Sequence, residues 1–388
     1  MNTAELDAYL ADCRRLTLSE IDAIIPKQSR SAPVLYQLML DYPLRQAKAM
    51  RPALCIATCR ALGGSLEAVL RSAAILELYH NAFLIHDDVE DGSESRRDRP
   101  TLHLSHGAPV AVNVGDAMLA LALEPLLDNM RLVGLGKALR IMQLIARMSR
   151  ESTEGQAIEL DWIRTGQWQL GDTDYVRMVY KKTSWYSFIT PVVVGGIVAG
   201  TAPEHLAVLR RLAALLGIAF QIQDDILNLT GEGDLYGKEF AGDLWEGKHT
   251  LIVMHALRTA PAADGERARR ILRKQRPRLE PGSSLQESLA AVLTRLRQRG
   301  DLTAAGRSAI DQTLAGRLAG GEAVKSREDI VYLLSLIERC GSLDYARRVA
   351  QRFARKAQTV LARVECLPPS VHRDFIASLV DFVVSRDH

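Results

Sequence analysis

The sequence predicts an all-α protein, and three observations support this fold class. Hydrophobic residues make up 47% of the chain but aromatic residues only 5%, so Ala, Leu and Val dominate the apolar set. This composition favours helix over sheet. Apolar residues recur at i, i+3, i+4 and i+7, whereas the alternation typical of strands is rare. Several segments are apolar on nearly every side, which predicts inner helices shielded by an outer layer.

The helical pattern recurs in order along the chain. The clearest predicted segments are 32–44, 66–86, 109–130, 209–229 and 327–364. The sequence contains no internal repeat, so we expect one domain over residues 1–388.

A polar and basic excursion interrupts this pattern from about 261 to 323. It contains Pro277, Pro281 and Gly282, which are typical of exposed connections. We expect one helix within it at about 285–299, and we interpret the basic run 267–278 as a solvated helix face.

Charge and cysteine content exclude several classes. A formal net charge of +3 gives no argument for nucleic-acid binding. The five cysteines are scattered without a CxxC pair, which indicates a reducing compartment. We expect Cys55 and Cys59 to pack in the core. The N-terminus lacks the apolar core of a signal peptide, and the longest unbroken apolar stretch, 191–200, is too short to span a bilayer. We therefore expect a cytoplasmic protein without stable membrane insertion.

An acidic cluster follows directly after the apolar segment that ends at 86. Asp87 and Asp91 lie on one helical face, with Asp88 beside them. Three such carboxylates repel one another unless positive charge lies between them. An exposed helix end that stops at the "DG" of 91–92 is the simpler interpretation, but it does not explain why the preceding residues are so apolar. Oxygen ligands on a helix suit Mg²⁺.

A second cluster supports the same chemistry. Asp224 and Asp225 again end an apolar helix, Asn228 follows at i+4, and Asp243 lies in the next segment. Basic residues accompany both clusters: Arg96, Arg97, Lys182, Lys238 and Lys248. Metal ions and bases together form the wall expected around a diphosphate.

These motifs, in this order, resemble those of the trans-isoprenyl diphosphate synthases of the polyprenyl synthetase family. The resemblance runs from "AKAMRP" at 47–52 to the C-terminus, except for the polar excursion. The first aspartate-rich motif is Asp87, Asp88 and Asp91; the second is Asp224 and Asp225, with Asn228 in place of a third aspartate. Further matches are "RRxxPT" at 96–101, "GD" at 115–116, "GQ" at 155–156, "KT" at 182–183 and "GK…DLxEGKxT" at 237–250.

The resemblance implies an isoprenoid-synthase-type helical bundle around a deep apolar cavity, with both acidic motifs at its mouth. It implies a prenyltransferase that condenses isopentenyl diphosphate with an allylic diphosphate to a linear trans-prenyl diphosphate. It also implies three Mg²⁺ ions bridged by diphosphate, and a homodimer.

The resemblance assigns roles residue by residue. The principal Mg²⁺ ligands are expected to be Asp87, Asp91 and Asp224, supported by Asp88, Asp225, Asn228 and Asp243 directly or through water. The allylic diphosphate is assigned to Arg96, Lys182, Lys248 and Lys238, and isopentenyl diphosphate to Lys48, Arg51, His80 and Arg97. Thr183 and Gln221 resemble positions whose oxygens face the allylic cation, and His86 is expected to be structural.

Product length is expected to depend on the residues one turn below the first motif. Phe83 restricts the chain whereas Ala82 leaves room, so we expect a product of about C15–C20. Met118, Leu119 and Leu123 are further candidates for the cavity floor, although ordinary core packing explains them equally well.

Three departures from the family pattern leave alternatives open. Ala49 replaces an arginine, and Asn228 replaces a carboxylate. Asp98 replaces a turn glycine, and Arg99 is expected to offset the negative charge that Asp98 adds. One alternative is a terpene synthase that ionises its substrate without coupling; the other is a non-catalytic subunit of a heteromeric synthase. The retained bases of the isopentenyl diphosphate site oppose the first, and the two acidic motifs oppose the second.

Overall fold

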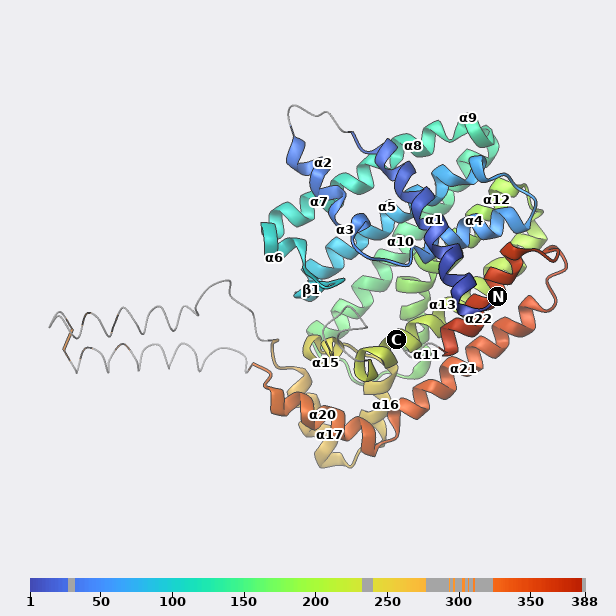
Figure 1. The fold of residues 1–388 in the computed structure, drawn as a ribbon. Coiled ribbons are helices and arrows are strands. Elements are labelled where there is room, and N and C mark those ends of the chain that lie inside the picture. Colours follow the sequence, from blue (N-terminus) through green and yellow to red (C-terminus); the bar gives the residue numbers. More distant parts are fainter. Residues whose placement is uncertain are drawn as a thin grey trace.

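The computed structural model describes residues 1–26, 32–231, 240–276 and 324–385, with a few single positions between 293 and 310. These residues form the predicted all-α bundle, shown in Figure 1. The predicted helix at 285–299 and most of the polar excursion lie outside the described residues.

The first half of the chain forms the helices that carry the first acidic motif. They are α1 (Thr3–Ile24), α2 (Pro33–Met39), α3 (Asp41–Leu44), α4 (Met50–Ala61), α5 (Leu66–Asp91), α6 (Leu102–His106), α7 (Ala108–Leu121), α8 (Leu123–Asp128), α9 (Met130–Val133) and α10 (Leu135–Thr165). The segment predicted as one helix at 109–130 is therefore divided between α7, α8 and the start of α9. Strands β1 (Ser95–Arg96) and β2 (Arg99–Pro100) form an antiparallel hairpin after α5.

The second half carries the second motif and returns to cover the bundle. It comprises α11 (Asp172–Val179), the π-helix η1 (Tyr180–Ile189), α12 (Thr190–Ala199), α13 (Pro203–Thr230), α15 (Gly242–Glu246), α16 (Leu251–Thr259), α17 (Ala262–Leu272), α20 (Arg327–Arg339), α21 (Ser342–Leu361) and α22 (Val371–Ser385).

Local sequence determines where the two motif helices begin and end. The side chain of Ser65 caps α5 by accepting the N–H of Ala68, and Gly92 ends the helix in the left-handed conformation at φ 64°. The helix α13 begins with Pro203, which suits the first turn, and ends before Gly231. Both motifs therefore lie at the C-terminal ends of long helices.

Three hydrophobic clusters hold the bundle together. The largest involves α4, α5, α10, α12 and α13, and Cys55 and Cys59 are fully buried within it, as predicted. A second cluster packs α16, α17, α20 and α21 beside α13. The third packs the end of α1 and the helices α2 and α7 against α5.

The expected start of the exposed excursion is wrong. Residues 262–272 form α17, and its Ala268, Ile271 and Leu272 are buried in the second cluster. Part of the basic run also contacts acidic residues, since Lys274 pairs with Asp329 at 2.6 Å. These residues belong to the packed bundle.

Among the described residues, three helical stretches are long and apolar enough to cross a membrane by length and composition. They are Leu66–Asp91, Ala108–Val133 and Pro203–Thr230. The expectation based on 191–200 considered only unbroken apolar runs, so it did not include helices in which polar residues interrupt the pattern.

Candidate active site

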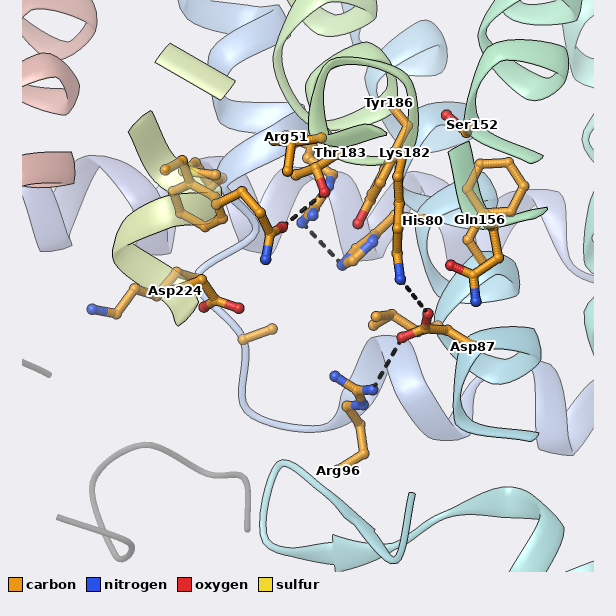
Figure 2. A pocket seen from close by; sticks show the side chains of 18 of the residues that line it. Arg51, His80, Asp87, Arg96, Ser152, Gln156, Lys182, Thr183, Tyr186 and Asp224 are labelled. Carbon is orange, nitrogen blue, oxygen red and sulfur yellow. Dashed lines mark hydrogen bonds and ion pairs between the residues drawn. The ribbon is translucent and has the colours of Figure 1, made fainter. Parts of the chain in front are cut away.

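A cavity of about 1240 Å³ brings most of the predicted site residues together. Its walls come from α4, α5, α10, η1 and α13, and the α15–α16 region adds Asp243, Lys248 and His249. Figure 2 shows Asp87 on α5 and Asp224 on α13 at the same pocket, with their carboxylates approaching it from different sides. The structure thus unites two motifs that are far apart in the sequence.

The adjacent aspartates of the first motif have different environments. Asp87 lines the cavity and lies 3.3 Å from Nζ of Lys182 and 3.7 Å from Nη2 of Arg96. Asp88 is fully buried: it accepts Nε–H of Arg96 at 3.0 Å and the hydroxyl of Tyr42 at 2.5 Å. Asp87 is therefore accessible from the cavity, whereas Asp88 is not.

Arg96 lies at the cavity wall and also contacts the buried aspartate. It lines the cavity but is only 8% exposed, and it pairs with both Asp87 and Asp88. Burial lowers the pKa of this guanidinium, but the neighbouring Asp88 outweighs that effect and the net pKa shift is upward. Arg96 thus holds the motif together from the cavity wall.

Lys248 connects the first motif to the α15 region. Its Nζ lies 2.7 Å from Asp91, 2.8 Å from Glu246 and 3.9 Å from Asp243. The side chain of Asp91 is 2% exposed. Burial raises the pKa of Asp91 above its ordinary range, although Lys248 opposes that shift. Lys248 therefore lies between Asp91 and the cavity.

The two aspartates of the second motif both line the cavity. Asp225 is only 5% exposed, and it accepts the hydroxyl of Tyr175 at 2.6 Å. Asp225 also accepts Nε2–H of Gln221 at 2.8 Å, and Oε1 of Gln221 accepts the hydroxyl of Thr183 at 2.7 Å. Burial raises the pKa of Asp225, against these hydrogen bonds. This chain fixes the orientation of the Gln221 amide at the cavity wall.

Asn228 makes a structural contact that the sequence did not predict. It is 4% exposed, and its Oδ1 accepts the backbone N–H of Asp243 at 3.1 Å. Its backbone carbonyl accepts the N–H of Ala241 at 2.9 Å. Asn228 does not line the cavity, whereas Asp243 does. Asn228 therefore positions the segment that carries Asp243, and its assignment as a metal ligand stays a prediction.

A π-helix presents the "KT" motif to the cavity. Lys182 ion-pairs with Glu159 on α10 as well as with Asp87, and these two acids raise its pKa against the effect of burial. A Cβ at Gly155 would lie 2.2 Å from the backbone nitrogen of Lys182. The glycine of "GQ" thus permits α10 and η1 to approach closely, and π-helical turns are frequent at functional sites.

A separate set of bases lines another part of the same cavity. Arg51 Nη1 lies 3.0 Å from Nε2 of His80, and Arg51 donates to Ser187 at 2.9 Å and 3.2 Å. His80 stacks on Tyr186, with the ring centroids 5.8 Å apart. Further cations that line this cavity are Lys48, Arg97 and Arg14.

One buried carboxylate accompanies these bases. Glu77 is 4% exposed and lines the cavity. Burial raises its pKa, and the charges of Arg51, Arg97 and Arg14 act against that shift. The predicted isopentenyl diphosphate residues are therefore together, in a predominantly positive environment.

Residues at and just after α3 hold the β1–β2 hairpin, which contains Arg96 and Arg97. Arg97 and Asp98 form its two-residue loop at φ 53° and 59°, a conformation for which glycine, asparagine and aspartate are preferred. Arg45 is 5% exposed and donates to the carbonyls of Arg96 and Pro100, each at 2.8 Å. Asp98 therefore adopts the positive φ that this turn requires, although it replaces a glycine.

Arg99 does not offset Asp98 as expected. Its guanidinium lies 3.3 Å from Asp41, which also pairs with Arg45 at 2.6 Å. Arg97 donates to the carbonyl of Tyr42 at 2.8 Å, and burial lowers its pKa to about 10. The hairpin is thus attached to α3 at several points.

The apolar part of the cavity corrects the expectation about which residues can limit the product. Phe83 lines the cavity, with its ring 5.7 Å from that of Tyr186, and Leu119 also lines it. Ala82 is fully buried in the third hydrophobic cluster and does not line the cavity. Met118 packs in the same cluster, and Leu123 is 51% exposed. Of these candidates, only Phe83 and Leu119 can contact a chain in this cavity.

Several residues of the site were not predicted from sequence. Glu159, Glu77, Tyr175 and Arg14 are charged or polar residues on otherwise regular helices, and their positions depend on helix packing. His86 was expected to be structural: it lies 3.3 Å from Asp116, and a Cβ at Gly115 would collide with its ring. The "GD" motif therefore packs against His86, which also lines the cavity. Lys238 lies outside the described residues.

The acidic residues are distributed around the cavity and do not form one compact cluster. Within the described ranges, no three His, Cys, Asp or Glu side chains are arranged to hold a single metal ion between them. Oxygen donors on separate walls suit Mg²⁺ that is also bound by waters and substrate phosphates. Asp87, Asp224 and Asp243 line the cavity and provide such donors.

Comparison with known proteins agrees with this arrangement. Residues 33–287 match the polyprenyl synthetase family. The short chain isoprenyl diphosphate synthase of Methanocaldococcus jannaschii is 35% identical over 255 residues, which cover 66% of this chain and 75% of that protein. The geranylgeranyl diphosphate synthase of Methanosarcina mazei is 27% identical over 343 residues, or 88% of this chain and 86% of that protein.

A solved structure shows the same fold. The crystal structure of geranylgeranyl pyrophosphate synthetase from Pyrococcus horikoshii aligns with a TM-score of 0.77 and 28% identity, and the alignment covers 100% of both chains. The cavity, the two aspartate motifs and these matches lead to one conclusion: the chain belongs to the polyprenyl synthetase family and is a prenyltransferase.

Proposed function

We propose that this protein condenses isopentenyl diphosphate with an allylic diphosphate in a Mg²⁺-dependent reaction, giving a linear trans-prenyl diphosphate of about C15–C20. The observation that carries this proposal is that two separate groups of basic side chains line one cavity. One combines the acidic motifs with Lys182 and Lys248; the other combines Lys48, Arg51 and Arg97.

The allylic diphosphate is assigned to the region between the two acidic motifs. Asp87, Asp224 and Asp243 would hold Mg²⁺, which when bound supplies the Lewis acidity that stabilises the departing diphosphate. Asp91 joins this set when Lys248 exchanges it for a diphosphate oxygen. Asp88 and Asp225 support the neighbouring ligands by fixing the ends of α5 and α13.

The remaining groups orient the reacting carbons. Lys182 and Lys248 provide charge-assisted contacts to diphosphate oxygens, and Arg96 adds positive charge beside Asp87. Thr183 and Gln221 form a hydrogen-bonded pair at the cavity wall, which supports their assignment as oxygens that face the allylic cation. These fixed dipoles need no reorientation as charge develops.

Isopentenyl diphosphate is assigned to the region without acidic motifs. Lys48, Arg51, His80 and Arg97 would bind its diphosphate, and we add Arg14, which lines the same cavity. Glu77 balances part of their charge and keeps the side chains close together. Arg14 lies before the matched family region, and it adds a cation to a site in which Ala49 replaces the usual arginine.

The proposed reaction needs no protein group as general base. The C1–O bond of the allylic substrate breaks, and the diphosphate keeps the electron pair. The double bond of isopentenyl diphosphate supplies the pair for the new carbon–carbon bond, and the proton then lost goes to the released diphosphate. Phe83 limits the product because it occupies the cavity wall one turn below Asp87.

A homodimer is the proposed assembly. The described residues expose sixteen large hydrophobic side chains, and nine of them lie between Leu104 and Leu139. Exposed apolar side chains that gather on neighbouring helices are typical of a protein–protein contact. We assign this surface, on α6–α10, to the second copy. The proposed cytoplasmic location rests on the five free cysteines.

The decisive experiment supplies each allylic diphosphate from C5 to C15, with and without isopentenyl diphosphate, and identifies products by mass spectrometry. We expect longer linear diphosphates only with isopentenyl diphosphate and Mg²⁺, and none with EDTA. A hydrocarbon or alcohol formed without isopentenyl diphosphate would overturn the proposal and indicate a terpene synthase.

A further inference from the structure

The polar segment 277–323 begins and ends at one place on the bundle. Gln275 and Val324 form a parallel β-bridge, and the N–H of Lys325 donates to the carbonyl of Gln275 at 2.8 Å. We call residues 275–276 and 324–325 the stem. The stem packs on the α15 region, because Nζ of Lys325 donates to the carbonyl of Trp245 at 2.7 Å.

A stem arginine pairs with an acid of α15. Arg276 Nη1 lies 3.2 Å from Oε1 of Glu246, and Nη2 lies 3.8 Å from Glu94, which follows the first aspartate motif. The hydroxyl of Ser93 also donates to Oε1 of Glu246, at 3.4 Å. The side chains of Arg276 and Glu246 are only 12% and 9% exposed, so water screens this pair weakly.

The other oxygen of Glu246 contacts the active-site lysine. Oε2 of Glu246 lies 2.8 Å from Nζ of Lys248, which lies 2.7 Å from Oδ2 of Asp91. Arg276, Glu246, Lys248 and Asp91 therefore form a continuous row of alternating charge. It runs from the stem to the aspartate motif.

We propose that Arg276 is a positioning residue for the allylic-diphosphate wall. By neutralising Glu246, Arg276 sets how Glu246 and Asp91 share the ammonium of Lys248. Without Arg276, Glu246 attracts Lys248 more strongly, and the ammonium is withdrawn from the diphosphate. The inference rests on the proposed function, since it takes Lys248 to be a diphosphate ligand.

The row of charges explains why the effect is selective. Lys248 and Asp91 belong to the allylic region, whereas Lys48 and Arg51 belong to the other anion-binding region. A change at Arg276 alters the charge of the row that contains Lys248, and neither Lys48 nor Arg51 belongs to that row. Arg276 is not part of any of the family motifs in this sequence, so the stem supplies this control independently of them.

The test is steady-state kinetics of Arg276→Gln with each substrate varied in turn. We expect the KM for the allylic diphosphate to rise about tenfold, the scale of one charge-assisted contact, while the KM for isopentenyl diphosphate stays within about twofold. Arg276→Lys retains the charge and is expected to recover most of the loss. The matched control is Arg270→Gln, an exposed arginine on α17, which is expected to behave as the wild type.

A double-mutant cycle identifies the route through Glu246. If Arg276 acts through Glu246, the pair Arg276→Gln/Glu246→Gln loses no more than Glu246→Gln alone. Wild-type KM values in Arg276→Gln, or equal losses for both substrates, would overturn the inference. If Arg276→Gln does not fold, Glu246→Gln tests the same row: because it removes the acid that competes for Lys248, the allylic KM should not rise, and a selective rise would overturn the inference. Lys248→Ala with an unchanged allylic KM would instead contradict the proposed function.

Discussion

Tyr42 and Asp88 are joined by a hydrogen bond of 2.5 Å between the phenol hydroxyl and the carboxylate Oδ2, although 46 residues separate them in the chain. Arg96 occupies Oδ1 of the same carboxylate. Successive residues of a helix point in directions about 100° apart. Asp88 therefore faces the core, whereas Asp87 faces the cavity.

Asp87 and Asp88 are expected to fail in different ways when changed to asparagine. Asp87→Asn should lower kcat by roughly 10²–10³-fold, because a carboxylate ligand of the proposed Mg²⁺ is lost, and should leave the free energy of unfolding nearly unchanged. Asp88→Asn breaks the buried pair with Arg96 and leaves that guanidinium only its longer contact with Asp87, and breaking a buried pair typically costs about 3–5 kcal/mol. Denaturant unfolding followed by tryptophan fluorescence, together with initial rates, separates these outcomes.

Tyr42→Phe is the control for this prediction. It removes one hydrogen bond to a charged group, a loss of about 1.5–3 kcal/mol, but leaves the Arg96 pair. Equal stability of the wild type and Asp88→Asn would show that the buried contacts of Asp88 do not hold the motif.

Product length is expected to respond to Phe83 and not to Ala82. Phe83→Ala enlarges the cavity and should shift the product distribution to chains at least one isoprene unit longer. Ala82→Phe instead overpacks the third hydrophobic cluster at about 1–3 kcal/mol, with the product unchanged in the folded enzyme. Mass spectrometry of the products and thermal unfolding measure the two effects. A longer product from a chain substituted at Ala82 would contradict the packing described above.

Arg14 is expected to contribute to binding of isopentenyl diphosphate. Arg14→Gln removes one of four cations that line this part of the cavity, so the KM for isopentenyl diphosphate should rise by about tenfold, with the allylic KM unchanged. Arg15→Gln is a matched control: Arg15 is the next residue of α1, its side chain is 69% exposed, and it pairs with Asp12. Equal KM values for the two variants would exclude Arg14 from the site.

The stability of the protein should depend on pH through His249. Its ring stacks on Trp168 at 3.7 Å, and burial lowers the pKa of His249 to about 4. An unfolded histidine titrates near about 6.5. Between these two pKa values the unfolded state binds more protons than the folded state. The contribution of His249 to the free energy of unfolding is therefore complete above the unfolded pKa. It decreases as the pH falls toward the folded pKa, by roughly 1 kcal/mol per pH unit.

The measurement is the free energy of unfolding at pH 5 and pH 7.5. In His249→Gln the difference between the two values should be smaller than in the wild type by about 1–2 kcal/mol. The exposed His205, changed to glutamine, is the control and should retain the wild-type difference. An unchanged pH dependence in His249→Gln would show that another group is responsible.

Sequence reasoning predicted the fold and the main site because their signals are local or ordered along the chain. Helical periodicity is visible in each segment, and the aspartate motifs keep a fixed spacing. It did not distinguish Ala82 from Phe83, because the rotation of α5 about its axis is determined by packing against α7 and η1. The environment of Asp88 was equally inaccessible, since it depends on Tyr42.

The wrong prediction for the start of the excursion has an identifiable cause. The polar composition of 262–272 concealed a regular spacing of Ala268, Ile271 and Leu272, which was the available signal for a packed helix. Asn228 was assigned by its position in a motif, and that position gave no indication that its Oδ1 accepts the N–H of Asp243. The π-helix at 180–189 had no local signal, because the close approach allowed by Gly155 involves another helix.

The β-bridge between Gln275 and Val324 also has a consequence for how this chain tolerates change in length. Because the two ends of the intervening segment are already adjacent, adding or removing residues between them alters loop-closure entropy only slowly, by about 0.6 kcal/mol for each doubling. The helices do not have to move apart to accommodate a longer segment. This point of the bundle can therefore accept insertions, or a fused domain, while the spacing of the two aspartate motifs stays the same.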